Sequence, residues 1–381
     1  MKRRIRVGAL VVVVLFCLPM QSHVVRIARA EAVGQRTSSV FRAPVGNLVR
    51  LLVAEGGRYA LWETGSDKEP TQWVFQYAQS GNVVSLAKLF HRPQETDFRP
   101  DPSFSPDGAM LMVRDYDGER SRLEVCDPNG PRSKSLLDAK GYDLDLLRNL
   151  SARWLGRRIL LWQTRRMLPL EILDPSTGGK EALSVSGQVW AASDDGCLLL
   201  VWGSDKAAQD RIIQGEKDSS EELMILDDKG EVVKRLDTTD MNANSVAAFS
   251  PGGGQVAFQW YSKPSAAPRF AGVRVVSTRT GDLLRDIKTE TLCGLTDSGS
   301  VLQKADNVTG FPGHTKFGPS SLLITDPRGN TNCLIKDVPI VCVTHIAAYY
   351  TNSTAGLPYV KSVAIPRQVE PQAKPLNGTS P

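Results

Sequence analysis

The feature that most constrains the fold of this chain is a series of glycines that recurs at nearly constant spacing. The glycines follow one another at intervals of 48 to 52 residues, and each closes a short polar turn after an apolar run of strand length. A repeat of fixed length indicates an architecture in which each unit buries its apolar face against its neighbours. The six glycines are Gly81, Gly130, Gly178, Gly230, Gly281 and Gly329.

A second series of turns lies earlier in every repeat. A run typical of a β-strand follows each of these turns, and glycine supplies the positive φ of a twisted hairpin at the lowest steric cost. Each repeat is therefore expected to hold four antiparallel strands, and four-stranded units of roughly 40 to 50 residues are the blades of β-propellers. The glycines of this first-turn series are Gly57, Gly108, Gly156, Gly196, Gly253 and Gly299.

Two of the repeats resemble a known kind of propeller blade. The turn Ser105-Pro-Asp-Gly108, followed by Leu123-Glu-Val-Cys-Asp-Pro-Asn-Gly130, resembles the WD-like repeat of TolB-type propellers, and Ser250-Pro-Gly-Gly253 is a weaker copy. The other four repeats share the turns and strands but lack Ser-Pro-Asp-Gly. The resemblance covers residues 48–337 as architecture, and it implies a periplasmic propeller that binds a protein or peptide.

Both ends of the repeat region can contribute to one further blade. Residues 340–350 and 359–365 supply two more strands, and residues 37–41 form a lone strand whose partner must come from elsewhere. Joining them would hide exposed sheet edges. We therefore predict an all-β fold, a β-propeller of seven four-stranded antiparallel blades with the last blade closed by both chain termini. Six blades are the alternative.

The N-terminus has the pattern of a secretory signal. Basic residues 2–6 precede an uncharged, mostly apolar run at 7–20, and Ala28-Arg29-Ala30 or Ala30-Glu31-Ala32 offers a small-x-small cleavage site. The run is shorter than the roughly 20 residues that cross a bilayer as a helix. We expect a signal peptide over 1–30, the propeller over 35–365 and a disordered Pro-rich tail over 366–381. The protein would be exported to the periplasm or beyond, with no membrane span after the signal.

The charge balance argues against nucleic acid as a partner. Beyond residue 30 the chain carries 40 basic and 41 acidic residues, a balance without the positive excess of nucleic-acid-binding proteins.

An odd number of cysteines remains after the signal, so at least one thiol is free or paired between chains. Without a Cys-x-x-Cys spacing, a structural zinc site is not expected. Cys333 and Cys342 could bridge adjacent strands, or they could be small buried side chains like Cys126, Cys197 and Cys293.

Repeats four to six have longer connections between their second and third strands than repeats one to three. The extra residues lie in 203–221, 261–272 and 304–319. In a propeller these connections open on one face, where binding residues concentrate, although long surface loops are also tolerated without a function. Aromatic and cationic side chains of the kind enriched in protein-binding patches occur there. The candidate binding residues are Tyr261, Arg269, Phe270, Phe311, His314 and Phe317.

Signals for catalysis are sparse. His91, His314 and His345 are far apart in the sequence, and no Gly-x-Ser-x-Gly elbow is present. We predict no catalytic residue, no metal ligand and no cofactor. The leading hypothesis is an exported, monomeric, non-catalytic propeller that binds a protein or peptide through its loop-rich face. The alternatives are a lactonase-, lyase- or hydrolase-like propeller enzyme with a metal at the channel mouth, acting on a small molecule or glycan, and a structural module of an envelope assembly.

Overall fold

The computed structural model describes residues 41–365 apart from a set of short segments. These are 43–47, 67–68, 93–99, 117–119, 131–132, 141–149, 164–167, 206–209, 211–220, 239–240, 263–269, 289–290, 307–319, 339, 345–346 and 353–358. The predicted signal peptide, the predicted C-terminal tail and residues 37–40 of the predicted lone strand lie outside the described residues.

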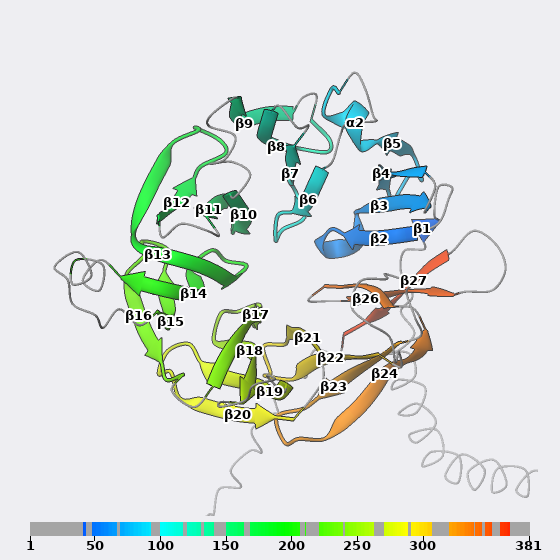
Figure 1. The fold of residues 1–381 in the computed structure, drawn as a ribbon. Helices are drawn as coiled ribbons and strands as arrows, with labels where there is room; N and C mark the ends of the chain where they lie inside the picture. Colours follow the sequence, from blue (N-terminus) through cyan, green and yellow to red (C-terminus); the bar gives the residue numbers. More distant parts are fainter. Residues whose placement is uncertain are drawn as a thin grey trace, which may run out of the picture.

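The described strands form antiparallel sheets that follow one another in chain order around a central axis (Figure 1). The first sheet holds β2 (Leu48–Val53), β3 (Tyr59–Ser66), β4 (Glu69–Tyr77) and β5 (Val83–Ser85). The second holds β6 (Pro100–Phe104), β7 (Leu111–Tyr116), β8 (Arg120–Cys126) and β9 (Ser133–Lys140). Two further four-stranded sheets come later in the chain. One holds β17 (Met241–Phe249), β18 (Gln255–Ser262), β19 (Phe270–Ser277) and β20 (Leu283–Ile287). The other holds β21 (Thr291–Leu295), β22 (Val301–Asp306), β23 (Ser320–Thr325) and β24 (Thr331–Val338). Two short helices, η1 (Glu55–Gly57) and α2 (Leu86–Leu89), accompany the first sheet.

The third and fourth repeats share one seven-stranded sheet. Its strands are β10 (Leu150–Leu155), β11 (Arg158–Gln163), β12 (Pro169–Leu173), β13 (Lys180–Ala192), β14 (Leu198–Asp205), β15 (Glu222–Asp227) and β16 (Val232–Leu236). The first half of β13 pairs with β12 and its second half pairs with β14. With β13 counted once in each half, the described strands form seven groups of four. We call these groups blades one to seven, starting from β2.

Blade seven joins the two ends of the described chain. It contains β1 (Phe41–Arg42), β27 (Tyr359–Ala364), β26 (Ala347–Asn352) and β25 (Ile340–Val343), in that order. Phe41 lies opposite Val360 in the ladder between β1 and β27, so the predicted pairing of the two ends is confirmed. The prediction of a single strand over 340–350 is wrong, because a turn at Thr344, where the amide donates to the Ala347 carbonyl at 2.8 Å, divides it into β25 and β26.

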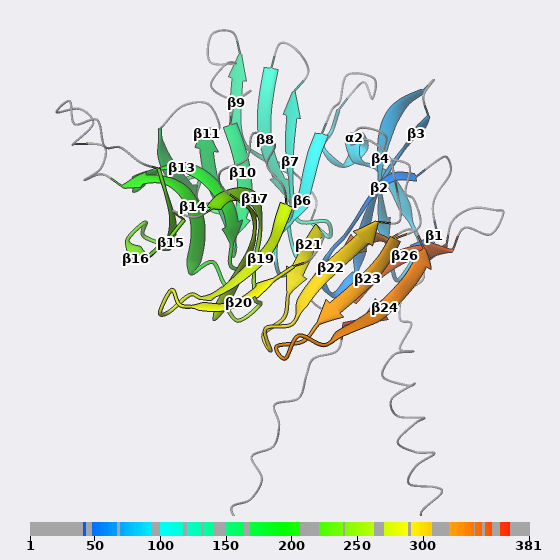
Figure 2. The ribbon, with the colours of Figure 1, turned by 60° about the horizontal axis from the view of Figure 1, so that its bottom comes forward.

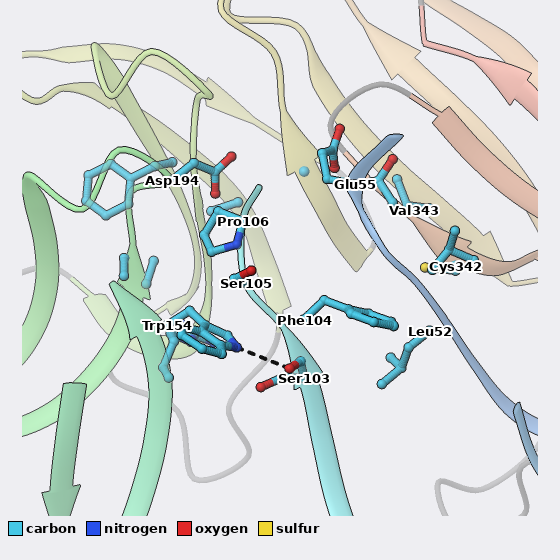
Figure 3. A pocket seen from close by; sticks show the side chains of 18 of the residues that line it. Leu52, Glu55, Ser103, Phe104, Ser105, Pro106, Trp154, Asp194, Cys342 and Val343 are labelled. Atoms are coloured by element: carbon cyan, nitrogen blue, oxygen red, sulfur yellow. Dashed lines mark hydrogen bonds between the residues drawn. The ribbon is translucent and has the colours of Figure 1, made fainter. Parts of the chain in front are cut away.

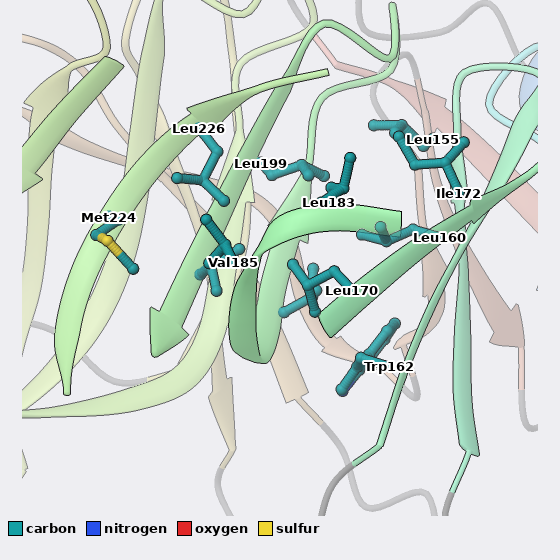
Figure 4. Close-up of a cluster of buried hydrophobic side chains, with 12 residues drawn as sticks. Leu155, Leu160, Trp162, Leu170, Ile172, Leu183, Val185, Leu199, Met224 and Leu226 are labelled. Atoms are coloured by element: carbon teal, nitrogen blue, oxygen red, sulfur yellow. The ribbon is translucent and has the colours of Figure 1, made fainter. Parts of the chain in front are cut away.

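The strands run between the two faces of the ring, which Figure 2 shows from the side. Consecutive blades pack through buried apolar side chains: the cluster drawn in Figure 4 contains Leu155 and Leu160 of blade three together with Met224 and Leu226 of blade four, all at 1% exposure or less. Burying one such side chain contributes about 1.5–3 kcal/mol. Since every blade buries its face against a neighbour, the ring is stabilised as a whole. Within the described residues, no helix is both long and apolar enough to span a membrane.

The turns behave as the repeat predicts. Eleven of the twelve turn glycines have positive φ, and the exception is Gly130. Aspartates support several of the second turns, because their carboxylates accept backbone amides: Asp227 Oδ1 accepts from Lys229 at 2.9 Å and from Glu231 at 2.8 Å. Such side-chain-to-backbone bonds fix a turn locally.

Candidate functional site

The three long connections begin and end on the same face of the ring. They follow the C-terminal ends of β14, β18 and β22, whereas the first turns lie at the opposite, N-terminal ends of these strands. The strand ends that flank the connections therefore lie on three neighbouring blades. We call this the long-connection face and its opposite the first-turn face.

An ionic clamp holds the base of the connection in blade four. Arg235 on β16 pairs with Asp205 at the end of β14 and with Glu222 at the start of β15. Burial lowers the pKa of Arg235, but the hydrogen bonds that it donates to these two carboxylates outweigh burial, so its pKa is raised overall. The two strand ends are thus tied together by a charge-assisted network.

A second cluster supports the base of the connection in blade five. The indole of Trp260 donates to Asp286 Oδ1 at 3.0 Å, and Arg274 Nε lies 3.3 Å from Asp286 Oδ2. The Arg274 guanidinium also lies over the Trp260 ring, 4.4 Å from its centroid. In blade four, Trp202 stacks on Trp190 with ring centroids 5.6 Å apart. Aromatic and arginine side chains therefore gather near this face.

The structure brings together two of the predicted binding residues. Tyr261 on β18 is half-buried and lies opposite Phe270, the first residue of β19, in the ladder between these strands. The other four candidates, Arg269, Phe311, His314 and Phe317, lie outside the described residues, and so does His345. His91 is exposed, with a φ of 54°.

Sequence reasoning missed the tryptophans near this face. A tryptophan occurs in the second strand of four blades, a few residues after the first turn, and this recurrence could have indicated them. They are Trp62, Trp162, Trp202 and Trp260.

A cavity of about 470 Å³ lies at the centre of the ring (Figure 3). It is lined by residues from the innermost strand of every blade. It is displaced toward the first-turn face, because Glu55, Pro106 and Asp194 of three first turns form part of its wall. The indole of Trp154 donates to the Ser103 carbonyl at 3.1 Å and so links the innermost strands of blades two and three.

Charged and thiol groups also line this cavity. Arg50 and Arg153 bring positive charge, Glu55 and Asp194 bring negative charge, and Cys342 faces the same space. Burial raises the pKa of the Cys342 thiol to about 11, which keeps it protonated at neutral pH. Across the described residues, no group of three or more His, Cys, Asp or Glu side chains is placed to hold a metal ion.

The five cysteines that follow the predicted signal are all free in the structure. The possible Cys333–Cys342 bridge is therefore not formed. Cys126 is buried, as predicted for a small apolar side chain, whereas Cys197 and Cys333 are exposed.

Fold and site together define the class of this protein as a β-propeller. No family model matches the chain, and no curated protein matches it. Among solved structures, an oligogalacturonate lyase from Vibrio parahaemolyticus is similar, with a TM-score of 0.51 at 12% identity over 87% of this chain and 95% of that one. A chain of the mitotic checkpoint complex has a TM-score of 0.51 at 14% identity over 87% of this chain and 93% of its own. TolB from Acinetobacter baumannii has a TM-score of 0.38 at 14% identity over 81% of each chain, so the likeness of fold rests on the first two.

Proposed function

We propose that this protein is an exported, non-catalytic propeller scaffold that binds a protein or peptide partner through the long-connection face. The observation that carries the proposal is the placement of three long connections on adjacent blades, with their bases at one end of the ring. A rigid ring that supports neighbouring surface segments is the usual design of a binding face.

The side chains at the bases of these connections support this function. The Asp205–Arg235–Glu222 clamp and the Trp260–Arg274–Asp286 cluster fix the strand ends from which the connections leave. Pre-organised supports reduce the entropy lost on binding. Tryptophan, tyrosine and arginine are also the residues that most often dominate binding energy at protein interfaces.

The proposal is tested by binding measurements on matched variants. Full-length protein is used to capture partners from an envelope extract of its source, and the captured protein is then purified and titrated against wild type by calorimetry. We expect Tyr261→Ser, and separately a short Gly-Ser linker in place of 307–319, to weaken affinity by at least about tenfold, as interface hot spots do.

The matched control is Arg157→Ser, which changes an exposed side chain on the first-turn face and should leave affinity unchanged. Thermal unfolding of each variant shows whether the ring remains folded. Equal affinity for wild type and both of these variants would reject the long-connection face as the binding site. A stoichiometric divalent metal found by elemental mass spectrometry, together with a fall in Tm on chelation, would favour the enzyme hypothesis instead.

A further inference from the structure

The central cavity contains an arginine without an acidic partner. Arg153 on β10 lines the cavity and is exposed to it, and its Nη1 donates to the Trp190 carbonyl on β13. No carboxylate of the described residues forms an ion pair with Arg153. A guanidinium has five N–H donors in a planar fork, so most of its donors remain available to a molecule in the cavity.

The surroundings of Arg153 favour an anion. The side chain of Arg153 faces the cavity, and burial by the surrounding ring lowers its pKa. The wall next to it consists largely of small side chains, including Ala152, Ala191 and Ala247, which leave the cavity open. Its volume of about 470 Å³ lies in the range of small-molecule sites, roughly 300–1,000 Å³.

The remaining wall indicates which anion fits. Leu52 and Phe104 of the adjacent blades one and two give the cavity an apolar side that can cover a carbon skeleton. Glu55 and Asp194 also face the cavity and would repel a multiply charged group such as phosphate. A single carboxylate on an apolar body satisfies both conditions.

We propose that the channel cavity binds a small organic acid, with the carboxylate of the ligand held by the Arg153 guanidinium and its apolar part against Leu52 and Phe104. Arginine pairs with carboxylates through two parallel N–H···O bonds, and these bonds strengthen where water is excluded. The cavity lies toward the first-turn face, so this site is separate from the proposed partner-binding face and can fail or succeed independently of it.

The test uses benzoate as the probe, with benzamide as its neutral counterpart and inorganic phosphate as a second anion. In calorimetric titrations of the full chain we expect benzoate to bind at millimolar concentration or below. Benzamide and phosphate should each bind at least about tenfold more weakly, since a charge-assisted hydrogen bond contributes about 1.5–3 kcal/mol. Absence of benzoate binding, equal binding of benzamide, or tighter binding of phosphate would overturn the proposal.

Variants then assign the site. Arg153→Gln should weaken benzoate binding by at least about tenfold, whereas Arg157→Gln removes one positive charge outside the cavity and should leave it unchanged. If Arg153→Gln fails to fold, the side-chain NMR signal of Arg153 in the wild type, assigned with Arg153→Lys, provides the second readout. Benzoate should shift this signal, and a titration that leaves it in place would exclude Arg153 as the anchor.

Discussion

The first turns of blades two and six both place a glycine of positive φ three residues after a hydroxyl residue, although their other side chains differ and the turn of blade six closes one residue earlier. In blade two, Ser105 Oγ donates to Asp107 Oδ1 at 2.7 Å and accepts the Met110 amide at 2.9 Å. In blade six, Thr296 Oγ1 accepts the Ser300 amide at 2.9 Å, and its second neighbour is the Ser298 hydroxyl, also at 2.9 Å. Both turns have a hydroxyl at the first position. Only the turn of blade two has a carboxylate at the third position, where blade six has Ser298.

The two turns also use their aspartates differently. Asp107 binds within its own turn, accepting the Ala109 amide at 3.0 Å, and it pairs with Arg157 of the next blade at 3.1 Å. Asp297 instead accepts the Gly252 amide of the preceding blade at 2.6 Å. In these two turns the hydroxyl and the glycine are shared, whereas the aspartate serves its own turn in blade two and the joint between blades in blade six.

The largest effect is expected from the glycines. Gly108 has a φ of 65°, and a Cβ there would lie 2.8 Å from the Glu55 carbonyl oxygen, a backbone atom of the neighbouring blade. Gly299 has a φ of 79°, but its Cβ would meet the flexible ends of Gln255 and Arg285. We expect Gly108→Ala to lower the free energy of unfolding by about 3 kcal/mol and Gly299→Ala by less, as measured by urea denaturation.

Gly81→Ala is the control for backbone strain alone, because Gly81 has a φ of 67° and a Cβ added there would meet no other atom within 4 Å. It should cost about 1 kcal/mol. An equal loss of unfolding free energy for all three variants would show that the close contact between blades one and two does not contribute to stability.

The next effect is expected from the hydroxyls that the two turns share. Ser105→Ala leaves the Met110 amide without its side-chain acceptor, and Thr296→Val does the same to the Ser300 amide. Each change should lower the free energy of unfolding by about 1–2 kcal/mol. A loss confined to blade two would mean that the hydroxyl acts only together with the carboxylate.

A smaller effect is the dependence of the free energy of unfolding on pH, which we expect to differ between the two turns. Hydrogen bonds from Ser105, Ala109 and Arg157 outweigh burial and hold the pKa of Asp107 below its usual value. The contribution of this carboxylate is complete above the unfolded pKa of about 3.9, and it is lost as the pH falls through the lower folded value. Asp107→Asn should therefore make unfolding less sensitive to acid between neutral pH and pH values below about 4.

The pH measurement has a control in blade six. Ser298→Ala changes the corresponding neutral group, so the difference from wild type should be the same at neutral and acidic pH. Parallel pH profiles for wild type and Asp107→Asn would contradict the role assigned to the carboxylate.

The smallest effect is expected at the joint between blades two and three. The Arg157 side chain is 86% exposed, although its Nε lies 3.1 Å from Asp107 Oδ2. Exposed ion pairs contribute little, so Arg157→Gln should change the free energy of unfolding by less than about 0.5 kcal/mol, and the change should vanish at high salt. A loss that persists at high salt would point to packing of the arginine stem.

Local chemistry in the sequence determined the repeat, the strands and the turns of this protein. Positive φ is accessible to glycine without a steric penalty, and aspartate or serine side chains bond to amides only a few residues away. These effects act within one hairpin, so the turn glycines could be recognised from spacing alone. The Ser-Pro-Asp-Gly motif was a narrower sign, because blade six builds a similar turn, one residue shorter, without it.

Only the tertiary structure decided which side chains face the channel and which residues pair where the ring closes. Bulges such as the one between Val189 and Ala191 shift the in-and-out alternation of an inner strand, and one shift moves every following side chain to the other face. The exposure of Arg153 to the cavity, the division of β13 between two blades and the pairing of Phe41 with Val360 therefore depend on contacts between distant parts of the chain. Sequence periodicity does not contain that information, because it records neighbours along the strand and not neighbours across the ring.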